Sequence, residues 1–156
     1  MSDVMVMSGV DRETAERQIV GGDRDFLNAR NRARLFSVVS LILGKFNRLN
    51  SLAGSLELKQ TTAESHLGTQ TIDIARIKGS ECRSADFDRR FMPKKRFLSH
   101  RWLSVNRAYH FGISLPAIQV FEVEGSYFVR DGNHRVSVAK YHGVRYIDAE
   151  VVRISS

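Results

Sequence analysis

The sequence predicts an α+β fold with a small mixed sheet. Three runs rich in β-branched and aromatic residues fall within the C-terminal quarter of the chain, and a short helical segment separates the second run from the third. The runs are Ala117–Glu124, Ser126–Arg130 and Val144–Ile154, and the helical segment is His134–His142. A strand, a hairpin, a turn, a helix and a final strand in this order are typical of a compact α+β domain.

Small turn residues separate these elements. Gly125 lies between the first two runs and predicts a tight hairpin. The turn residues 131–133 (DGN) precede the helix, and Gly143 suits the left-handed position that ends it. Further upstream, Thr71–Lys78 (TIDIARIK) alternates isoleucine with other residues, which predicts a half-buried strand that ends at Gly79.

Helices are expected in the N-terminal third. Asp11–Ile19 predicts a short polar helix that the pair Gly21-Gly22 stops, because glycine is a poor helix residue. A longer helix with an aspartate cap is expected to follow and to continue to about Leu49. Its apolar residues recur at helical spacing and predict a core-facing stripe, with a dimer seam or a basic helix that tracks a nucleic-acid backbone as alternatives. The stripe consists of Leu35, Val39, Ile42, Phe46 and Leu49.

Two further segments complete the order of elements. Ser51–Gln70 is polar and poorly periodic, so a linker or a small variable element is expected there. Leu98–Tyr109 predicts a helix, with Leu98, Trp102 and Val105 on one apolar face.

The composition excludes several classes of protein. The chain has 156 residues, and its net charge of +7 favours an anionic partner such as nucleic acid, a nucleotide or a membrane surface. The single cysteine, Cys82, excludes a disulfide framework and a cysteine-based zinc site. The longest apolar stretch, Leu35–Leu43, is far shorter than the roughly 20 residues of a membrane span. No run of signal-peptide type is found near the start, so a soluble cytoplasmic protein with no membrane partner is expected.

The most basic window is Arg83–Tyr109, where five aromatic residues interleave with the cations. Cations suit phosphates and rings suit unstacked bases, so this window predicts contact with nucleic acid, DNA in particular, through single strands. The alternative is a solvated basic face over a core stripe of Phe91, Trp102 and Val105. The candidate nucleic-acid-binding residues are Arg89, Arg90, Lys94, Lys95, Arg96 and Arg101.

The turn at Asp131–Arg135 (DGNHR) predicts a phosphate site. Gly132 allows the backbone to approach a ligand closely, and the first amides of the following helix have no intrahelical acceptor. The helix dipole adds positive potential there, and Arg135 has a planar guanidinium that suits phosphate oxygens. The alternative is an ordinary capped turn, with Arg135 and His134 in no functional role.

Two stretches resemble the ParB/sulfiredoxin superfamily. Leu115–Val152 resembles its core, in which a hairpin leads into a Gly-x-x-Arg turn at the start of a helix, and Thr71–Arg83 resembles its first strand and the arginine-bearing loop after it. The signature DGNHRVSVA and the upstream Asp86–Pro93 are similar to those of bacterial ParB-like proteins. The resemblance implies a ParB/sulfiredoxin-like domain over residues 66–156, preceded by an N-terminal helical extension over residues 1–65.

The resemblance also implies a ligand. Gly132 and Arg135 match the residues with which this superfamily holds nucleotide phosphates, so a nucleoside triphosphate (CTP or ATP) with Mg²⁺ is the expected cofactor. Asn133, however, stands where sulfiredoxin has its catalytic cysteine, which leaves reductase chemistry without a nucleophile. Asn133, His134 and Ser137 also replace a glutamate and two arginines of the partition-type box. Partition proteins continue into a helix-turn-helix DNA reader, whereas this sequence stops at Ser156, so a ParB-like protein without that reader is expected.

Three functions remain open. The first is a binding module in which Arg83, Gly132, Asn133, His134 and Arg135 hold a phosphate. The second is a phosphoryl-transfer enzyme or nuclease, with Asp131 as acid or magnesium ligand and His134 as base. The third is a dimeric interaction protein that pairs through the N-terminal helix and has a vestigial pocket. Carboxylates that converge near Arg135 would favour the enzyme, and a pocket of arginines, amides and aromatic rings would favour the binding module.

Overall fold

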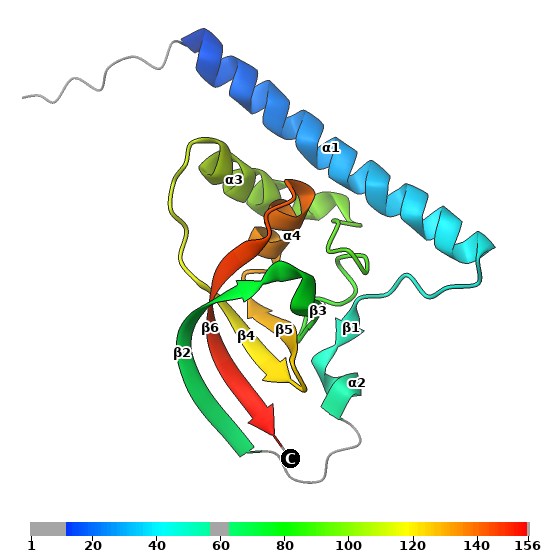
Figure 1. Ribbon diagram of the computed structural model, residues 1–156. Helices are drawn as coiled ribbons and strands as arrows, with labels where there is room; N and C mark the ends of the chain where they lie inside the picture. The colour runs from blue at the N-terminus through cyan, green and yellow to red at the C-terminus, as the bar shows by residue number, and fades with distance from the viewer. Residues whose placement is uncertain (1–11, 57–62, 156) are drawn as a thin grey trace, which may run out of the picture.

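The computed structural model describes residues 12–56 and 63–155, in which six strands form one mixed sheet beside a layer of helices (Figure 1). The strand order is β1-β3-β5-β4-β6-β2, with parallel pairs at β1/β3, β3/β5 and β4/β6 and antiparallel pairs at β4/β5 and β2/β6. The strands are β1 (Asn50–Ser51), β2 (Ala63–Asp73), β3 (Ile77–Ser80), β4 (Ile118–Val123), β5 (Ser126–Asp131) and β6 (Tyr146–Ser155).

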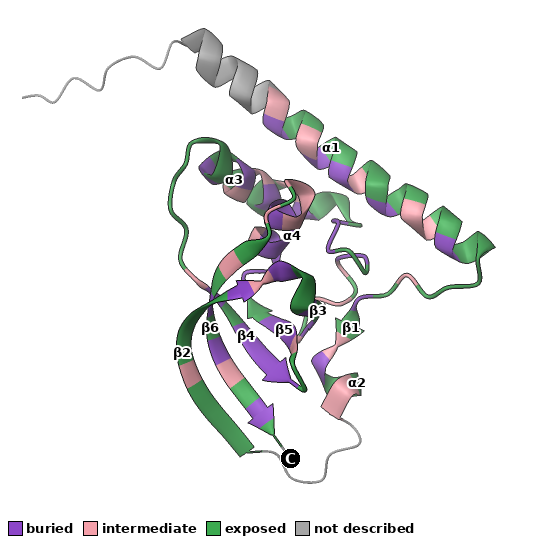
Figure 2. Cartoon of the chain, in the orientation of Figure 1, coloured by how far each residue is buried: buried purple, intermediate pink, exposed green. Residues whose placement is uncertain are grey.

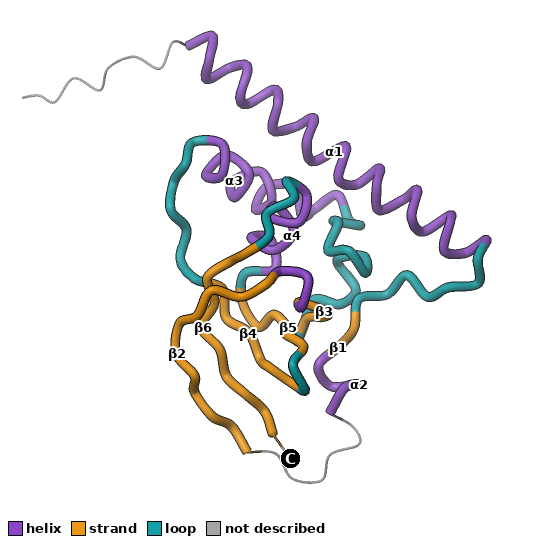
Figure 3. The backbone as a smooth tube through the Cα atoms, viewed as in Figure 1, coloured by secondary structure: helices purple, strands orange, loops and turns teal. Residues whose placement is uncertain are grey.

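Four α-helices accompany the sheet in the described part of the chain, and Figure 3 shows them against the strands. Helix α3 packs against both α1 and α4, so the three longest helices form one layer. The α-helices are α1 (Arg12–Ile42), α2 (Leu52–Leu56), α3 (Ser99–His110) and α4 (Asn133–Tyr141), with short 3₁₀ turns at Ile74–Arg76 and Arg96–Leu98.

The α+β class and the mixed sheet are confirmed, and so are the elements of the C-terminal part. Strands β4 and β5 form the expected hairpin, in which Val123 pairs with Ser126. The two loop residues, Glu124 and Gly125, both have positive φ (49° and 76°), as a type I′ turn requires. Gly143 has the expected left-handed conformation after α4 (φ 72°). The division at residue 65 stays a prediction, although β2 runs across it.

The prediction for the N-terminal helices was wrong in two respects. A single helix α1 runs through Gly21 and Gly22, because tertiary contacts outweigh the weak propensity of glycine; Gly22 is buried beside Leu103 and Asn106 of α3. The helix also ends at Ile42 instead of Leu49, and Gly44 with φ 62° follows the end.

The predicted stripe does not face the core. Leu35, Ile42 and Phe46 are 67%, 78% and 91% exposed, and only Leu49, in the loop after α1, is fully buried. The buried face of α1 instead carries small residues and one ring, and α1 packs against α3 (Figure 2). The predicted homodimer through this helix stays a prediction, and the exposed apolar residues would be its surface. The residues of the buried face are Gly22, Phe26, Ala29, Ala33 and Ser40.

Two predictions for the segment between α1 and the basic window were also wrong. Ser51–Gln70, expected to be a linker or a small variable element, contains α2 and most of β2, which belongs to the main sheet; residues 57–62 lie outside the description. The expected strand Thr71–Lys78 is divided, because the Asp73 carboxylate caps the amide of Ala75 at 2.8 Å and a 3₁₀ turn separates β2 from β3. The expected helix Leu98–Tyr109 is confirmed as α3, displaced by one residue.

Within residues 12–56 and 63–155, no helix combines the length and the apolar character that a bilayer crossing requires.

The buried face of α1 gives a stability prediction. Phe26 is 4% exposed and its ring lies 5.6 Å from that of Trp102, so Phe26→Ala should lower the free energy of unfolding by about 3–4 kcal/mol. Ile42→Ala, on the same helix, should change it by less than about 0.5 kcal/mol. Urea unfolding of both variants measures the difference. If Ile42→Ala lowered the free energy of unfolding by more than Phe26→Ala does, the result would contradict the observed orientation of α1.

Candidate functional site

The candidate site lies where two parallel strands end side by side. Strands β3 and β5 are neighbours in the sheet, with Ser80 opposite Val129, so the loops that follow them leave the same edge. Ligand sites in sheets with parallel strands form preferentially outside such carboxyl ends. The loop after β3 contributes Arg83, and the turn after β5 contributes Gly132. Helix α3 forms the opposite wall of a cavity of about 450 Å³.

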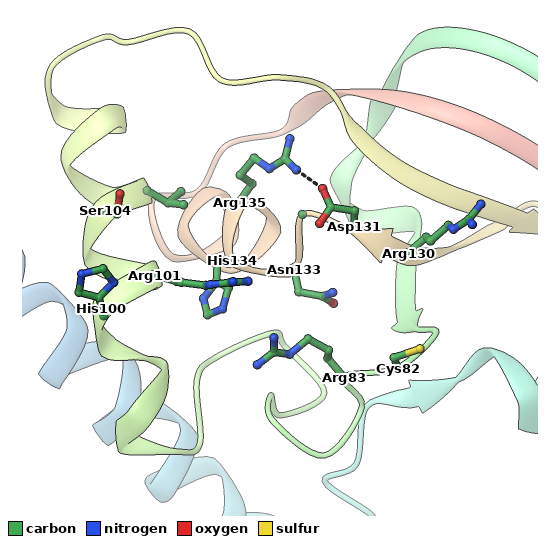
Figure 4. Close-up of a pocket in the computed structure, with 12 residues that line it drawn as sticks. Cys82, Arg83, His100, Arg101, Ser104, Arg130, Asp131, Asn133, His134 and Arg135 are labelled. Atoms are coloured by element: carbon green, nitrogen blue, oxygen red, sulfur yellow. Dashed lines mark hydrogen bonds and ion pairs between the residues drawn. The ribbon is translucent and has the colours of Figure 1, made fainter.

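The residues that line this cavity are mainly basic and polar, and Figure 4 shows how they lie. We refer to it below as the α4 cavity. All five residues predicted for phosphate binding line it, together with His100, Ser104 and Arg130, which the sequence did not indicate. Its lining comprises Cys82, Arg83, His100, Arg101, Ser104, Val105, Arg130, Asp131, Gly132, Asn133, His134 and Arg135.

Gly132 makes the sharp turn from β5 into α4. Its φ of 101° is in the left-handed region, and a Cβ built on it would lie 2.5 Å from Cγ2 of Ile118. No other residue type fits without displacing β4. The turn exposes the start of α4: Val136 donates to the Gly132 carbonyl at 3.0 Å, whereas the described residues offer no acceptor to the amides of Asn133, His134 and Arg135. These three amides are available to a ligand.

Two buried side chains in the α4 cavity have unpartnered polar atoms. Asn133 and His134 are 5% and 8% exposed, and neither Oδ1 of Asn133 nor either ring nitrogen of His134 has a hydrogen-bond partner among the described residues. Buried polar groups are rarely left without a partner, because the desolvation cost is then not offset. In Figure 4, the Asn133 side chain extends on the side of Arg83 and the His134 ring on the side of Arg101. This arrangement is what a site for a polar ligand requires.

The electrostatic potential in the α4 cavity is positive. Burial and, to a smaller extent, the charges of Arg83 and Arg101 together lower the pKa of His134 to about 4, although Asp86 acts in the opposite direction. His134 is therefore neutral at neutral pH and is held against the edge of Phe87, with 5.5 Å between the ring centroids. An anion beside this ring would raise the pKa of His134 again, because its negative charge would offset the charges of the two arginines.

The two arginines differ in how they are held. Arg83 is oriented by Asp86, which accepts from its Nε at 2.8 Å and also from Nζ of Lys95 at 2.7 Å. Arg101 has no ion pair with any described carboxylate. Although burial works in the opposite direction, the hydrogen bonds from Lys95 and Arg83 lower the pKa of Asp86. Asp86 therefore stays ionised and holds Arg83 at the cavity.

Arg135, the predicted phosphate clamp, is already hydrogen-bonded. Its guanidinium donates to the carbonyls of Pro116 and Ala117, the latter at 2.9 Å, and to Oδ2 of Asp131 at 2.5 Å. Figure 4 shows it turned away from His134 and toward Asp131. These contacts tie the segment before β4 to the turn before α4. The clamp role stays a prediction, and it would require Arg135 to exchange at least one of these partners.

The predicted catalytic and metal-binding carboxylate is Asp131. Its side chain is 69% exposed and paired with Arg135, and it is the one carboxylate in the described lining of the α4 cavity. Asp88 is fully buried and accepts hydrogen bonds from the amides of Arg90 and Met92 at 2.9 and 2.8 Å, so it stabilises its own turn. The structure therefore does not bring Asp86 or Asp88 together with Asp131 in this cavity.

The predicted nucleic-acid residues do not all line one cavity. Arg101 lines the α4 cavity, whereas Arg89 and Arg90 line a second cavity of about 770 Å³ together with Lys140 and other cations. Lys95 pairs with Asp86. Of the five interleaved rings, Phe87, Phe91 and Trp102 are fully buried, and only Phe97 and Tyr109 are exposed. Binding of DNA by Arg89, Arg90, Lys94, Lys95, Arg96 and Arg101 stays a prediction.

Comparison with known proteins adds no identification: no family model, curated protein or solved structure matches this chain. The ParB/sulfiredoxin resemblance therefore stays a prediction from the motifs around Gly132 and Arg135.

The buried His134 predicts a pH dependence of stability. Its pKa is about 4 in the folded chain against 6.5 when unfolded, so the unfolded state binds more protons between these values. The free energy of unfolding should fall as the pH drops from 7 to 5, and the contribution of His134 to this loss should be about 2 kcal/mol. Urea unfolding at both pH values, with His134→Gln as the comparison, measures it. An equal loss in the variant would show that His134 titrates normally.

Proposed function

We propose that this chain is a nucleotide- or phosphate-binding module of ParB/sulfiredoxin type, with its anion site in the α4 cavity. One observation carries the proposal: Asn133 and His134 are buried with unpartnered polar atoms at the start of α4, opposite Arg83 and Arg101. A phosphate group supplies acceptor oxygens for the free amides and for the N–H of His134, and negative charge for the two arginines.

Each group has a defined role in the proposed complex. The amides of Asn133, His134 and Arg135 donate to one phosphate group, and the neutral His134 ring donates from one nitrogen. Arg83 and Arg101 neutralise the charge from two sides. The Asn133 side chain either accepts from a ligand hydroxyl or, with its amide turned over, donates to a phosphate oxygen.

The cofactor predictions are part of this proposal. A nucleoside triphosphate such as CTP or ATP would place its phosphates at the start of α4. Magnesium would need Asp131 to release Arg135, and it would then bind mainly through phosphate oxygens and water, as Mg²⁺ usually does with nucleotides.

The observed lining favours a binding module over an enzyme. Phosphoryl transfer or nuclease chemistry would need Asp131 as acid or metal ligand and His134 as base. Asp131 is paired with Arg135, and the neighbouring carboxylates Asp86 and Asp88 hold other groups. The enzyme stays the second hypothesis, and the integrity of the bound nucleotide distinguishes it from the first.

A thermal-shift panel tests the proposal. Phosphate, pyrophosphate and nucleoside di- and triphosphates are added with and without Mg²⁺, and at least one should raise the melting temperature of the chain. Arg101→Ala should weaken binding of that ligand about 10- to 100-fold, because it removes a charge-assisted hydrogen bond. Arg107→Ala is the matched control, since Arg107 is exposed on the same helix and does not line the cavity.

Two results would contradict the proposal. One is a melting temperature that no anion changes, and the other is equal loss of affinity in Arg101→Ala and Arg107→Ala. Chromatography of the nucleotide recovered after incubation tests the enzyme hypothesis. Intact nucleotide is expected, whereas Mg²⁺-dependent cleavage that Asp131→Asn abolishes would replace the binding module by the enzyme.

A further inference from the structure

A second polar cluster lies at the other end of α4, away from the anion site. It joins Asp25 of α1, His110 at the end of α3 and His142 directly after α4. One ligand atom of each residue lies within 4.8 Å of the ligand atoms of the other two, and Oδ2 of Asp25 is 3.0 Å from Nε2 of His110. Three segments that are distant in the sequence thus bring two imidazoles and a carboxylate together.

Asn106 orients two members of the cluster. This residue is fully buried; its Nδ2 donates to Oδ2 of Asp25 at 3.1 Å, and its Oδ1 is 2.7 Å from Nε2 of His142. Because Nδ2 is directed at the carboxylate, Oδ1 faces the ring, so Nε2 of His142 carries the proton and Nδ1 keeps its lone pair. A ring whose N–H is held by a carbonyl oxygen is the usual arrangement of a metal-binding histidine.

Neighbouring side chains hold the members of the cluster in place. Oδ1 of Asp25 accepts from the hydroxyl of Tyr141 at 3.2 Å, in addition to the contacts of Oδ2 with Asn106 and His110. The His142 ring is half-buried. Tyr109 stacks on this ring with 4.2 Å between the centroids and holds its orientation.

We propose that Asp25, His110 and His142 form a binding site for a divalent transition-metal ion, with Zn²⁺ as the best-matched ion. Two imidazoles and one carboxylate are a usual zinc ligand set, whereas Mg²⁺ and Ca²⁺ prefer oxygen ligands alone. Two ligands of a tetrahedral zinc ion lie roughly 3.4 Å apart, given bonds of about 2.1 Å. The spacing of Asp25 and His110 is close to this value, and the ion would replace the proton they share.

The proposed site connects α1 to the body of the chain. His110 is exposed, so the fourth position of the ion would be open to water. Because the ligands come from α1, α3 and the end of α4, bound metal would hold these three segments together and stabilise the docking of α1. The site is independent of the anion site, so either proposal can fail without the other.

Equilibrium dialysis of the full chain against ZnCl₂, after treatment with EDTA, tests the proposal. One zinc ion per chain is expected to bind and to raise the melting temperature, and EDTA should reverse both effects. Co²⁺ in place of Zn²⁺ should give the visible absorption of a nitrogen- and oxygen-bound ion. MgCl₂ at the same concentration should not change the melting temperature.

Variants decide whether the named residues bind the ion. His110→Gln and His142→Gln should each weaken zinc binding by more than about tenfold. Two matched controls, His66→Gln and Cys82→Ser, change exposed potential ligands outside the cluster and should bind zinc as the wild type does. Circular dichroism shows whether each variant folds. If His142→Gln does not fold, the zinc affinity of His110→Gln alone tests the proposal, because His110 is exposed. Absence of binding by the wild type, or unchanged affinity of His110→Gln, would overturn the proposal.

Discussion

The parallel pairing of β3 with β5 is the constraint on which the candidate site depends. These strands come from distant parts of the sequence, and their pairing places the loop with Arg83 beside the turn at Gly132. The backbone continues this pairing beyond the strands, since the amide of Glu81 donates to the Val129 carbonyl at 2.9 Å. Without this register, the first amides of α4 would face solvent and no basic loop would lie opposite them.

Gly132 makes the turn that exposes the first amides of α4 beside this strand pair. Its left-handed conformation lets β5 pass directly into α4, and Ile118 lies so close beneath it that a side chain has no room. Arg135 strengthens the same turn by holding the carbonyls of Pro116 and Ala117. The buried polar groups of the site, Asn133 and His134, thus follow a turn that close packing and hydrogen bonds hold in place.

Local signals explain which parts of the fold could be predicted. The hairpin at Gly125 and the end of α4 at Gly143 depend on backbone conformations that few residues adopt, so the sequence indicates them directly. Strand β2 gives no such signal: it is mostly exposed and polar, and it is held by pairing with β6, which is distant in the chain. Helix α1 was mispredicted because its buried face consists of small residues such as Ala29 and Ala33, whereas its larger apolar residues are exposed. For both β2 and α1, packing against another element determines the structure, and the local sequence does not show which element that is.

The residues of the two candidate sites could likewise be predicted only where a local motif indicates them. The turn at residues 131–135 is a contiguous motif, and Arg83 follows a recognisable strand, so both could be placed at one site in advance. The contribution of Arg101 could not, because it depends on how α3 lies against the start of α4. The cluster of Asp25, His110 and His142 was missed for the same reason, since its members come from three separate segments.

The titration of the His134 ring, followed by NMR, tests the central claim most directly. The claim is that the α4 cavity is a desolvated, positively charged site for a phosphate. In the free chain, the ring should titrate with a pKa of about 4. With saturating triphosphate, the pKa should rise, because the negative charge offsets Arg83 and Arg101 and stabilises the protonated ring. A pKa near 6.5 in the free chain, or one that triphosphate leaves unchanged, would contradict the account.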